Sequence, residues 1–289
     1  VAIGNADNNG KDKTIATNEA INSVAIGTHA VVTKADTVAI GHNAGAVNTQ
    51  ATALGANANA AGEQSNALGY KSSASGNQST AVGTEANAAG QEATALGYKA
   101  NSNGYRTTAI GHSSSATGAM AVALGNQANA RGTLSQAFGD HAIASAENAT
   151  AIGTNANANA EKGIAFGTHA GVSGVSGIAF GDGAMSNAKQ AISIGKSART
   201  TAENAVALGS SAIATSNNAI AVGNSSNAIG ANSLAMGVNS KALKDNTIAL
   251  GNNVSVTAAN AVALGLNSTA YGENSIVMGT SAKNTGNHA

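Results

Sequence analysis

A four-residue pattern recurs through this chain at a fixed interval of 14 residues. An apolar residue, an alanine, a second apolar residue and a glycine occur as Val24-Ala25-Ile26-Gly27, and the pattern returns up to Ile276-Val277-Met278-Gly279. The two end glycines are 252 residues apart, which is 18 × 14, and each 14-residue mark between them carries a glycine. A register held over 19 copies without a slip indicates that each copy stacks on the one before it. The sequence therefore predicts a solenoid.

The length of the repeat selects strands rather than helices. Helical solenoid repeats need about 33 to 47 residues, whereas 14 residues are enough for two short strands and two corners. Apolar residues followed by glycine fit the end of such a strand, so we expect a flat, two-sided β-roll. An earlier copy, Val1-Ala2-Ile3-Gly4, precedes Gly27 by 23 residues, one period plus nine. Residues 1–22 are therefore expected to form a first coil with a loop insertion between Asn8 and Asn22, and residues 23–289 an uninterrupted series of repeats.

The composition limits what these coils can contain. The 289 residues include 36 Gly, no Pro, no Cys and no Trp, and only 2% are aromatic although 43% are hydrophobic. Any core is therefore thin and made of small aliphatic side chains. Without cysteine the chain has no disulfide, thiolate metal site or cysteine nucleophile. The 14 basic and 14 acidic residues cancel, so the charge balance predicts neither a nucleic-acid partner nor direct contact with a membrane.

Aligned repeats predict which faces of the roll are apolar. The residue before each repeat glycine is apolar, the residue three before it is Val, Ile, Leu or Thr except at Asn66 and Gln136, and the residue between them is nearly always Ala. Because successive strand side chains point to opposite faces, both faces of this strand are apolar. The second strand instead alternates small residues with polar ones, as expected of a half-buried strand.

An apolar column along an outer face exceeds the apolar area that a soluble monomer usually exposes. We therefore expect the alanine column to be the contact face of a parallel cyclic homo-oligomer. The alanines expected at this interface include Ala25, Ala39, Ala53, Ala123, Ala151, Ala207 and Ala263.

The corners carry glycine, amide and charged residues. A second glycine seven residues after the first, as at Gly62 and Gly76, is expected to supply backbone freedom at the other turn. Asparagines five residues before the repeat glycine, such as Asn204 and Asn218, are suited to amide ladders between stacked coils. The repeat glycines expected to be structural turn residues include Gly27, Gly41, Gly55, Gly125, Gly209 and Gly279.

The repeats Asn22-Ser23-Val24-Ala25-Ile26-Gly27 and Ala205-Val206-Ala207-Leu208-Gly209, at this strict spacing, resemble the head repeats of trimeric autotransporter adhesins of the YadA-like type. The resemblance spans nearly the whole chain. It implies a left-handed parallel β-roll in each chain, a parallel homotrimer, and display at the cell surface, projecting from the outer membrane of a Gram-negative bacterium. It also implies a role in virulence or biofilm through attachment to extracellular matrix proteins, host cells or other bacteria.

No constellation of nucleophile, base and orienting group is visible, so we expect neither an enzyme nor a cofactor. His141 and His169 share a column but lie two coils apart, about 10 Å, too far to share a metal ion. Exposed Tyr beside cations is a favourable composition for a protein-binding surface. The residues expected to contact a ligand, with Arg106 on the opposite turn side from the other five, are Tyr70, Lys71, Tyr98, Lys99, Arg106 and His112.

Two functions remain open at this point. In the first, the segment is an adhesin head that binds extracellular partners through its surface. In the second, it is a non-binding structural rod that projects another binding domain of the same fibre.

Overall fold

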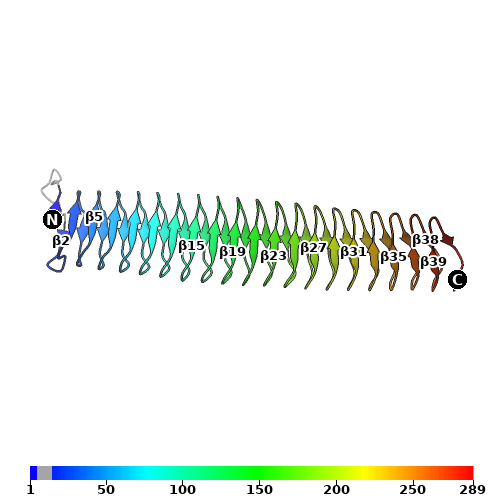
Figure 1. Cartoon of the computed structure of the whole chain (residues 1–289). Helices are drawn as coiled ribbons and strands as arrows, with labels where there is room; N and C mark the ends of the chain where they lie inside the picture. Colours follow the sequence, from blue (N-terminus) through cyan, green and yellow to red (C-terminus); the bar gives the residue numbers. More distant parts are fainter. Residues whose placement is uncertain (5–14, 289) are drawn as a thin grey trace. The chain divides into compact units, whose positions relative to one another are not determined.

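The computed structural model describes residues 1–4 and 15–288. They divide into unit 1, residues 1–145, and unit 2, residues 146–289. Each unit is a parallel β-solenoid in which a coil contributes one strand to sheet A and one shorter strand to sheet B (Figure 1). The expected all-β solenoid with 14-residue coils is confirmed. No helix in the described ranges has the length and apolar character needed to cross a membrane.

In unit 1, sheet A contains β1 (Ala2–Ile3), β3 (Val24–Ile26), β5 (Val38–Ile40), β7 (Thr52–Leu54), β9 (Asn66–Leu68), β11 (Thr80–Val82), β13 (Thr94–Leu96), β15 (Thr108–Ile110), β17 (Val122–Leu124) and β19 (Gln136–Phe138). Sheet B contains β2 (Ile15–Ala16), β4 (Val31–Val32), β6 (Gly45–Ala46), β8 (Asn59–Ala60), β10 (Ser73–Ala74), β12 (Asn87–Ala88), β14 (Asn101–Ser102), β16 (Ser115–Ala116), β18 (Asn129–Ala130) and β20 (Ile143–Ala144).

In unit 2, sheet A contains β21 (Thr150–Ile152), β23 (Ile164–Phe166), β25 (Ile178–Phe180), β27 (Ile192–Ile194), β29 (Val206–Leu208), β31 (Ile220–Val222), β33 (Leu234–Met236), β35 (Ile248–Leu250), β37 (Val262–Leu264) and β39 (Ile276–Met278). Sheet B contains β22 (Asn157–Ala158), β24 (Gly171–Val172), β26 (Met185–Ser186), β28 (Arg199–Thr200), β30 (Ile213–Ala214), β32 (Asn227–Ala228), β34 (Lys241–Ala242), β36 (Ser255–Val256), β38 (Thr269–Ala270) and β40 (Lys283–Asn284).

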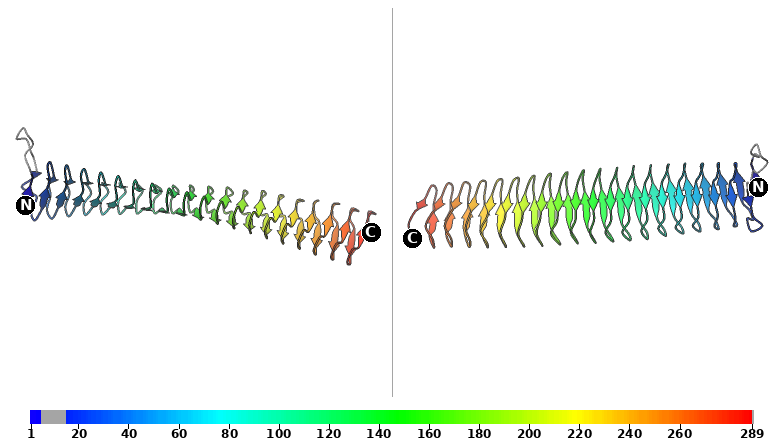
Figure 2. Two further views of the ribbon diagram at one scale, coloured as in Figure 1. Left: turned by 90° about the horizontal axis from the view of Figure 1, so that it is seen from above. Right: turned by 180° about the vertical axis from the view of Figure 1, so that it is seen from behind.

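The repeat register sets the pairing of neighbouring coils. Each strand pairs in parallel with the equivalent strand of the next coil, as when Ala81 of β11 lies opposite Ala95 of β13. Sheet B uses the same offset, with Ala74 opposite Ala88. Within each unit, equivalent residues therefore form columns one coil apart, and the turns follow one another along both edges (Figure 2).

The first coil of unit 1 departs from this register. Ala2 lies opposite Ala25, a separation of 23 residues, and Ile15 lies opposite Val31, a separation of 16. Two of the nine extra residues therefore lie between Ile15 and Val31, and the other seven lie between Ala2 and Ile15. The rest of the expected insertion, including Asn8, lies outside the described residues.

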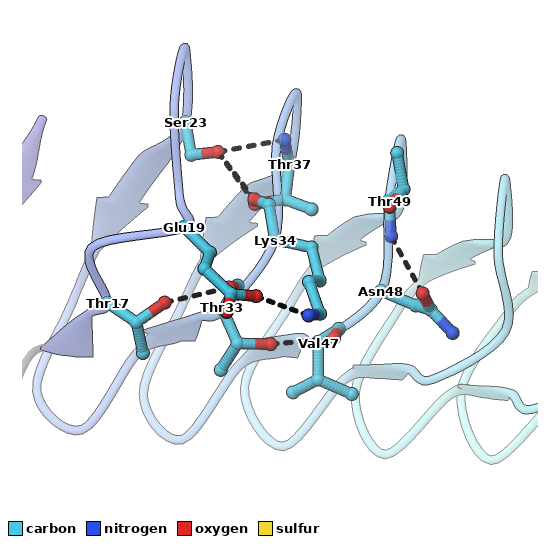
Figure 3. A network of polar contacts seen from close by, with 9 residues as sticks. All are labelled: Thr17, Glu19, Ser23, Thr33, Lys34, Thr37, Val47, Asn48 and Thr49. Atoms are coloured by element: carbon cyan, nitrogen blue, oxygen red, sulfur yellow. Dashed lines mark hydrogen bonds and ion pairs between the residues drawn. The ribbon is translucent and has the colours of Figure 1, made fainter.

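Polar side chains connect the first coils (Figure 3). The Oγ of Ser23 accepts hydrogen bonds from the backbone N–H of Thr37 at 3.1 Å and from its hydroxyl at 2.9 Å. The Thr17 hydroxyl donates to the carbonyl of Thr33 at 2.7 Å, and the Thr33 hydroxyl donates to the carbonyl of Val47 at 2.6 Å. Each bond joins one coil to the next, so the edge of the stack is held by side chains as well as by the strand ladder.

The interior of each coil is narrow. It is filled by alanines and small hydroxyl residues, and its largest fully buried side chains are Val and Thr, such as Val32 and Thr107. Several buried hydroxyls are paired within their own coil, as Thr107 donates to the carbonyl of Gly104 at 2.8 Å and Ser65 to that of Gly62 at 2.6 Å. A coil of this width has no room for the larger aliphatic residues of the same strands.

The alanine column occupies this interior, which corrects the expectation that it faces a partner chain. The alanine is the middle residue of the three-residue sheet A strands, except for Ser193 in β27 and Val277 in β39, and its two neighbours point out of the coil. Because no surface of these alanines is accessible in the single chain, none is left to contact a second one. The alanines expected at an interface and found with 0% exposure are Ala25, Ala39, Ala53, Ala123, Ala151, Ala207 and Ala263.

The glycines at the two turns of each coil are required for different reasons. The repeat glycines have positive φ, including 124° at Gly27 and 139° at Gly41, and a Cβ on either would lie 2.5–2.6 Å from the next coil's carbonyl oxygen. The second-turn glycines are not in the left-handed region, which corrects the expectation of backbone freedom there. At Gly62 a Cβ would lie 2.0 Å from the carbonyl oxygen of Gly76, so this glycine is required by close stacking of the coils.

Apart from Gly183, the left-handed turn positions are occupied by non-glycine residues, many of them Asn or Gln, with φ between 52° and 59°. Asparagine tolerates this conformation better than most residues. In unit 2 the side chains of these asparagines form the expected amide ladder, with Nδ2 to Oδ1 distances of 3.1–3.4 Å between successive coils. The ladder residues are Asn204, Asn218, Asn232, Asn246, Asn260 and Asn274.

Candidate binding surface

The outward face of sheet A is apolar. In each strand, the residues on either side of the buried alanine point away from the coil, and many are large aliphatic or aromatic side chains exposed by more than a third. Phe166 and Phe180 stack on this face with ring centroids 4.7 Å apart and planes 5° from parallel. The larger exposed side chains of this face include Leu54, Leu96 and Leu124 in unit 1 and Phe166, Phe180, Leu208, Met236 and Leu264 in unit 2.

A second surface, the tyrosine corner, lies at the turn that follows sheet A in unit 1. It carries Tyr70 and Lys71 on one coil, Tyr98 and Lys99 two coils further along, and His112 on the next coil. The rings of Tyr98 and His112 stack at a centroid distance of 5.2 Å and an angle of 25°. The structure thus brings Tyr98, Lys99 and His112 into one contact group.

Each lysine of the tyrosine corner lies near the ring of the preceding tyrosine. The Lys71 Nζ is 5.2 Å from the Tyr70 ring centroid, and the Lys99 Nζ is 5.1 Å from that of Tyr98. Both lysines have left-handed backbone, with φ of 54° and 55°. Tyr70 and Tyr98 remain 46% and 43% exposed, so their rings are open to a partner.

The neighbours of Lys99 favour the charged form of its side chain. Interaction with Tyr98, chiefly hydrogen bonding, and then the negative charge of Glu85 raise the pKa of Lys99. The Glu85 carboxylate lies 3.6 Å from the Lys99 Nζ across one coil. The tyrosine corner therefore presents aromatic faces beside a fixed ammonium group, a composition typical of protein-binding hot spots.

Arg106 lies apart from the other five expected ligand-contacting residues. It belongs to the turn between β14 and β15, whereas Tyr98 and Lys99 lie in the turn between β13 and β14. Its guanidinium carbon is 4.9 Å from the Tyr105 ring centroid, and it binds Glu92 through two contacts of 2.7 and 3.3 Å. Hydrogen bonding to Glu92 raises the pKa of Arg106. Arg106 therefore lies at the opposite edge of the coil from the tyrosine corner.

The structure extends the tyrosine corner by residues that the sequence analysis did not select. His112 Nδ1 lies 3.0 Å from Asn126 Oδ1, and Asn126 Nδ2 donates to Asp140 Oδ1 at 2.6 Å. Hydrogen bonds from Asn126, and next from His141, lower the pKa of Asp140. Counting 14 residues from Lys99 and from His112 would have found Glu85 and Asn126, because each neighbour in a column is one repeat away.

The described residues offer no alternative site built on metal chemistry. Within residues 1–4 and 15–288, no three His, Asp or Glu side chains are grouped so that they could hold a metal ion. The ionisable side chains instead form pairs between or within turns, such as Lys189 with Glu203 at 3.1 Å and Lys162 with Glu161 at 3.0 Å.

These features define a class of protein: a β-solenoid of 14-residue coils with a small-residue interior, an apolar outer sheet and polar corners. The family model described as the YadA head domain repeat (2 copies) matches residues 19–44, 46–65, 65–86, 88–114, 116–145, 144–170, 201–226, 228–253 and 257–282. The chain belongs to this family, and the resemblance to a YadA-like adhesin head is confirmed. No curated protein was found to match the chain. The YadA head family is not an enzyme family, and it implies a surface-exposed autotransporter adhesin.

Proposed function

We propose that this segment is the head of a surface adhesin and that it attaches to extracellular matrix proteins, to host cells or to neighbouring bacteria. The observation that carries the proposal is the tyrosine corner, where stacked Tyr98 and His112 lie beside Lys99 on an exposed turn. Family membership supports an adhesin-type role. In this proposal the parent protein projects the head from the outer membrane of a Gram-negative bacterium and contributes to virulence or biofilm formation.

We also propose that the head is a parallel homotrimer, as YadA-like heads generally are. The support in this chain is the apolar face of sheet A, which water contacts in a single chain but a partner would cover. If three identical chains packed their sheet A faces together around a central axis, sheet B and both edges of each chain would remain exposed. Each partner molecule would then meet three copies of the tyrosine corner, and binding would depend on avidity.

The test is solid-phase binding of the protein to a panel of matrix proteins, host cells and bacterial cells. A variant combining Tyr70→Ala, Tyr98→Ala and Lys99→Ala removes two exposed tyrosines and one cation from the tyrosine corner. We expect it to bind at least about tenfold more weakly, because a hot-spot side chain contributes about 2 kcal/mol or more.

A matched control removes the same kinds of side chain elsewhere. It combines Tyr105→Ala and Arg106→Ala at the other edge with Tyr271→Ala in unit 2, where the tyrosine is 53% exposed. We expect this variant to bind like the wild type. Equal losses in both variants would assign binding to another surface, and absence of binding to every panel member would favour the alternative role of a structural rod that projects a different binding domain.

A further inference from the structure

The acidic and basic side chains of unit 2 are distributed differently between its turns and sheet B. Its acidic residues all lie in turns, and they are Glu147, Glu161, Asp182, Glu203, Asp245 and Glu273. No acidic residue occurs in the ten sheet B strands of this unit, β22 to β40. The outward face of sheet B in unit 2 is therefore free of carboxylates although the chain as a whole is neutral.

Three cations occupy one column of this face. Arg199, Lys241 and Lys283 are the outward residues of β28, β34 and β40, and all three are exposed. The register runs from Arg199 through Ile213 and Asn227 to Lys241, and onward through equivalent positions to Lys283. The cations are therefore spaced three coils apart, about 14 Å.

These three cations differ from three of the four turn lysines of unit 2, the fourth being Lys244. Lys162, Lys189 and Lys196 each lie within 4 Å of a carboxylate, at 3.0, 3.1 and 3.9 Å. Among the described residues of this unit, no carboxylate lies within ion-pair distance of Arg199, Lys241 or Lys283. Their charge is thus available to an anion from solution.

The middle cation adjoins a hollow in the surface. The hollow has a volume of about 350 Å³ and is lined by Asn239, Lys241, Asn253, Val254 and Ser255. A lysine, two asparagines and a serine therefore line one concavity. These groups suit a ligand that carries both an anionic group and hydroxyl groups.

We infer that the outward face of sheet B in unit 2 binds an extended acidic polysaccharide. The chain of the ligand would run along the column, with carboxylate or sulfate groups at the three cations and one of them in the hollow beside Lys241. Between the cations, the neutral polar residues Asn227, Ser255 and Thr269 would meet the sugar hydroxyl groups. This site lies in unit 2 and is independent of the tyrosine corner in unit 1.

The wide spacing of the three cations favours an acidic polysaccharide over a more densely charged polyanion. Double-stranded DNA carries one charge per about 1.7 Å, far more than one cation per about 14 Å can match. The sheet B strands of unit 2 also contain no aromatic residue on which a base could stack. A polysaccharide with one acidic group every few sugar units has a comparably sparse charge.

The test uses the full chain and immobilised hyaluronan, which carries one carboxylate per disaccharide, with neutral dextran as the blank. The variant combines Arg199→Ala, Lys241→Ala and Lys283→Ala. We expect it to bind hyaluronan about tenfold more weakly than the wild type, because three exposed charge contacts are lost. The control combines Lys162→Ala, Lys189→Ala and Lys196→Ala, which removes three cations from the turns of the same unit, and it should bind within about twofold of the wild type.

Several results would overturn the inference. One is no binding of wild type to hyaluronan, or equal binding to dextran. Another is an equal loss in both triple variants, which would show a response to net charge alone. Tighter binding to duplex DNA or to phosphatidylserine vesicles than to hyaluronan would assign the face to a different partner. The tyrosine-corner variant should retain hyaluronan binding, so failure of the adhesin proposal and failure of this inference are separable.

Discussion

Gly41 and Gly45 lie four residues apart in one coil, yet the structure makes different demands on them. At Gly41, φ is 139° and a Cβ would lie 2.5 Å from the carbonyl oxygen of Gly55 in the next coil. At Gly45 the nearest atom to a Cβ would be Asn59 Oδ1 at 3.7 Å, an ordinary contact, and φ is not in the left-handed region.

We therefore expect Gly41→Ala to destabilise the protein by at least about 3 kcal/mol, because it adds backbone strain to a clash that only backbone movement can relieve. Gly45→Ala should change the stability by less than about 1 kcal/mol. Urea unfolding followed by circular dichroism measures both. Equal midpoints for the two variants would show that the repeat glycine is not a structural requirement.

Asn232 combines a backbone role with a side-chain role. Its φ is 55°, and its amide accepts from Asn218 at 3.1 Å and donates to Asn246 at 3.3 Å. Asn232→Gly should lose only the ladder bonds, about 1 kcal/mol, whereas Asn232→Ala should lose a further 1–2 kcal/mol or so from the left-handed backbone. Thermal unfolding of both variants separates the two contributions, and equal stabilities would mean that the backbone conformation carries no cost.

At the scale of the strand, the sequence predicts position and register but not which face is inside. The 14-residue period places Val24–Ile26 and its equivalents in strands and aligns Ala81 with Ala95. Side-chain alternation then yields two apolar faces, and periodicity alone cannot orient them. The width of the coil decides, because its interior accepts Ala, Ser, Thr and Val and leaves Leu124 and Phe180 outside. The small size of the alanines is the signal available in the sequence, because only residues of that size fit the narrow interior.

The candidate site shows the same division between what spacing predicts and what it does not. Residue type and column identify Tyr98, Lys99 and His112, which the structure brings together. The spacing also places Arg106, five residues before a repeat glycine, at the opposite turn, and the structure has it there between β14 and β15. Contacts such as Lys99 with Glu85 follow from the 14-residue register, but the distance of 3.6 Å requires coordinates.

For the whole molecule, the proposed assembly predicts a mass. Sedimentation equilibrium should give about three times the 27.7 kDa of the chain, because water-exposed aliphatic and aromatic side chains on sheet A favour association. A concentration-independent monomer would contradict the homotrimer and would leave the apolar face to another partner.

Two adjacent residues of β17 separate folding of the chain from its assembly. Ala123 is fully buried in the coil, whereas Leu124 is 47% exposed on the outward face of sheet A. Ala123→Glu would bury an unpaired charge, which costs several kcal/mol, so we expect loss of the β-sheet circular dichroism signal. Leu124→Glu leaves the interior unchanged and should keep that signal while weakening association by about 1.5–3 kcal/mol per chain.

The control for this pair is Ser115→Glu on the outward side of sheet B in the same unit. It adds the same charge to a face that the proposed trimer leaves open. Its circular dichroism signal and its sedimentation should therefore both match those of the wild type. If Leu124→Glu also sediments like the wild type, sheet A is not the contact face. If Ala123→Glu folds normally and only dissociates, the alanine column would have to face a partner chain after all, and the orientation of sheet A would be wrong.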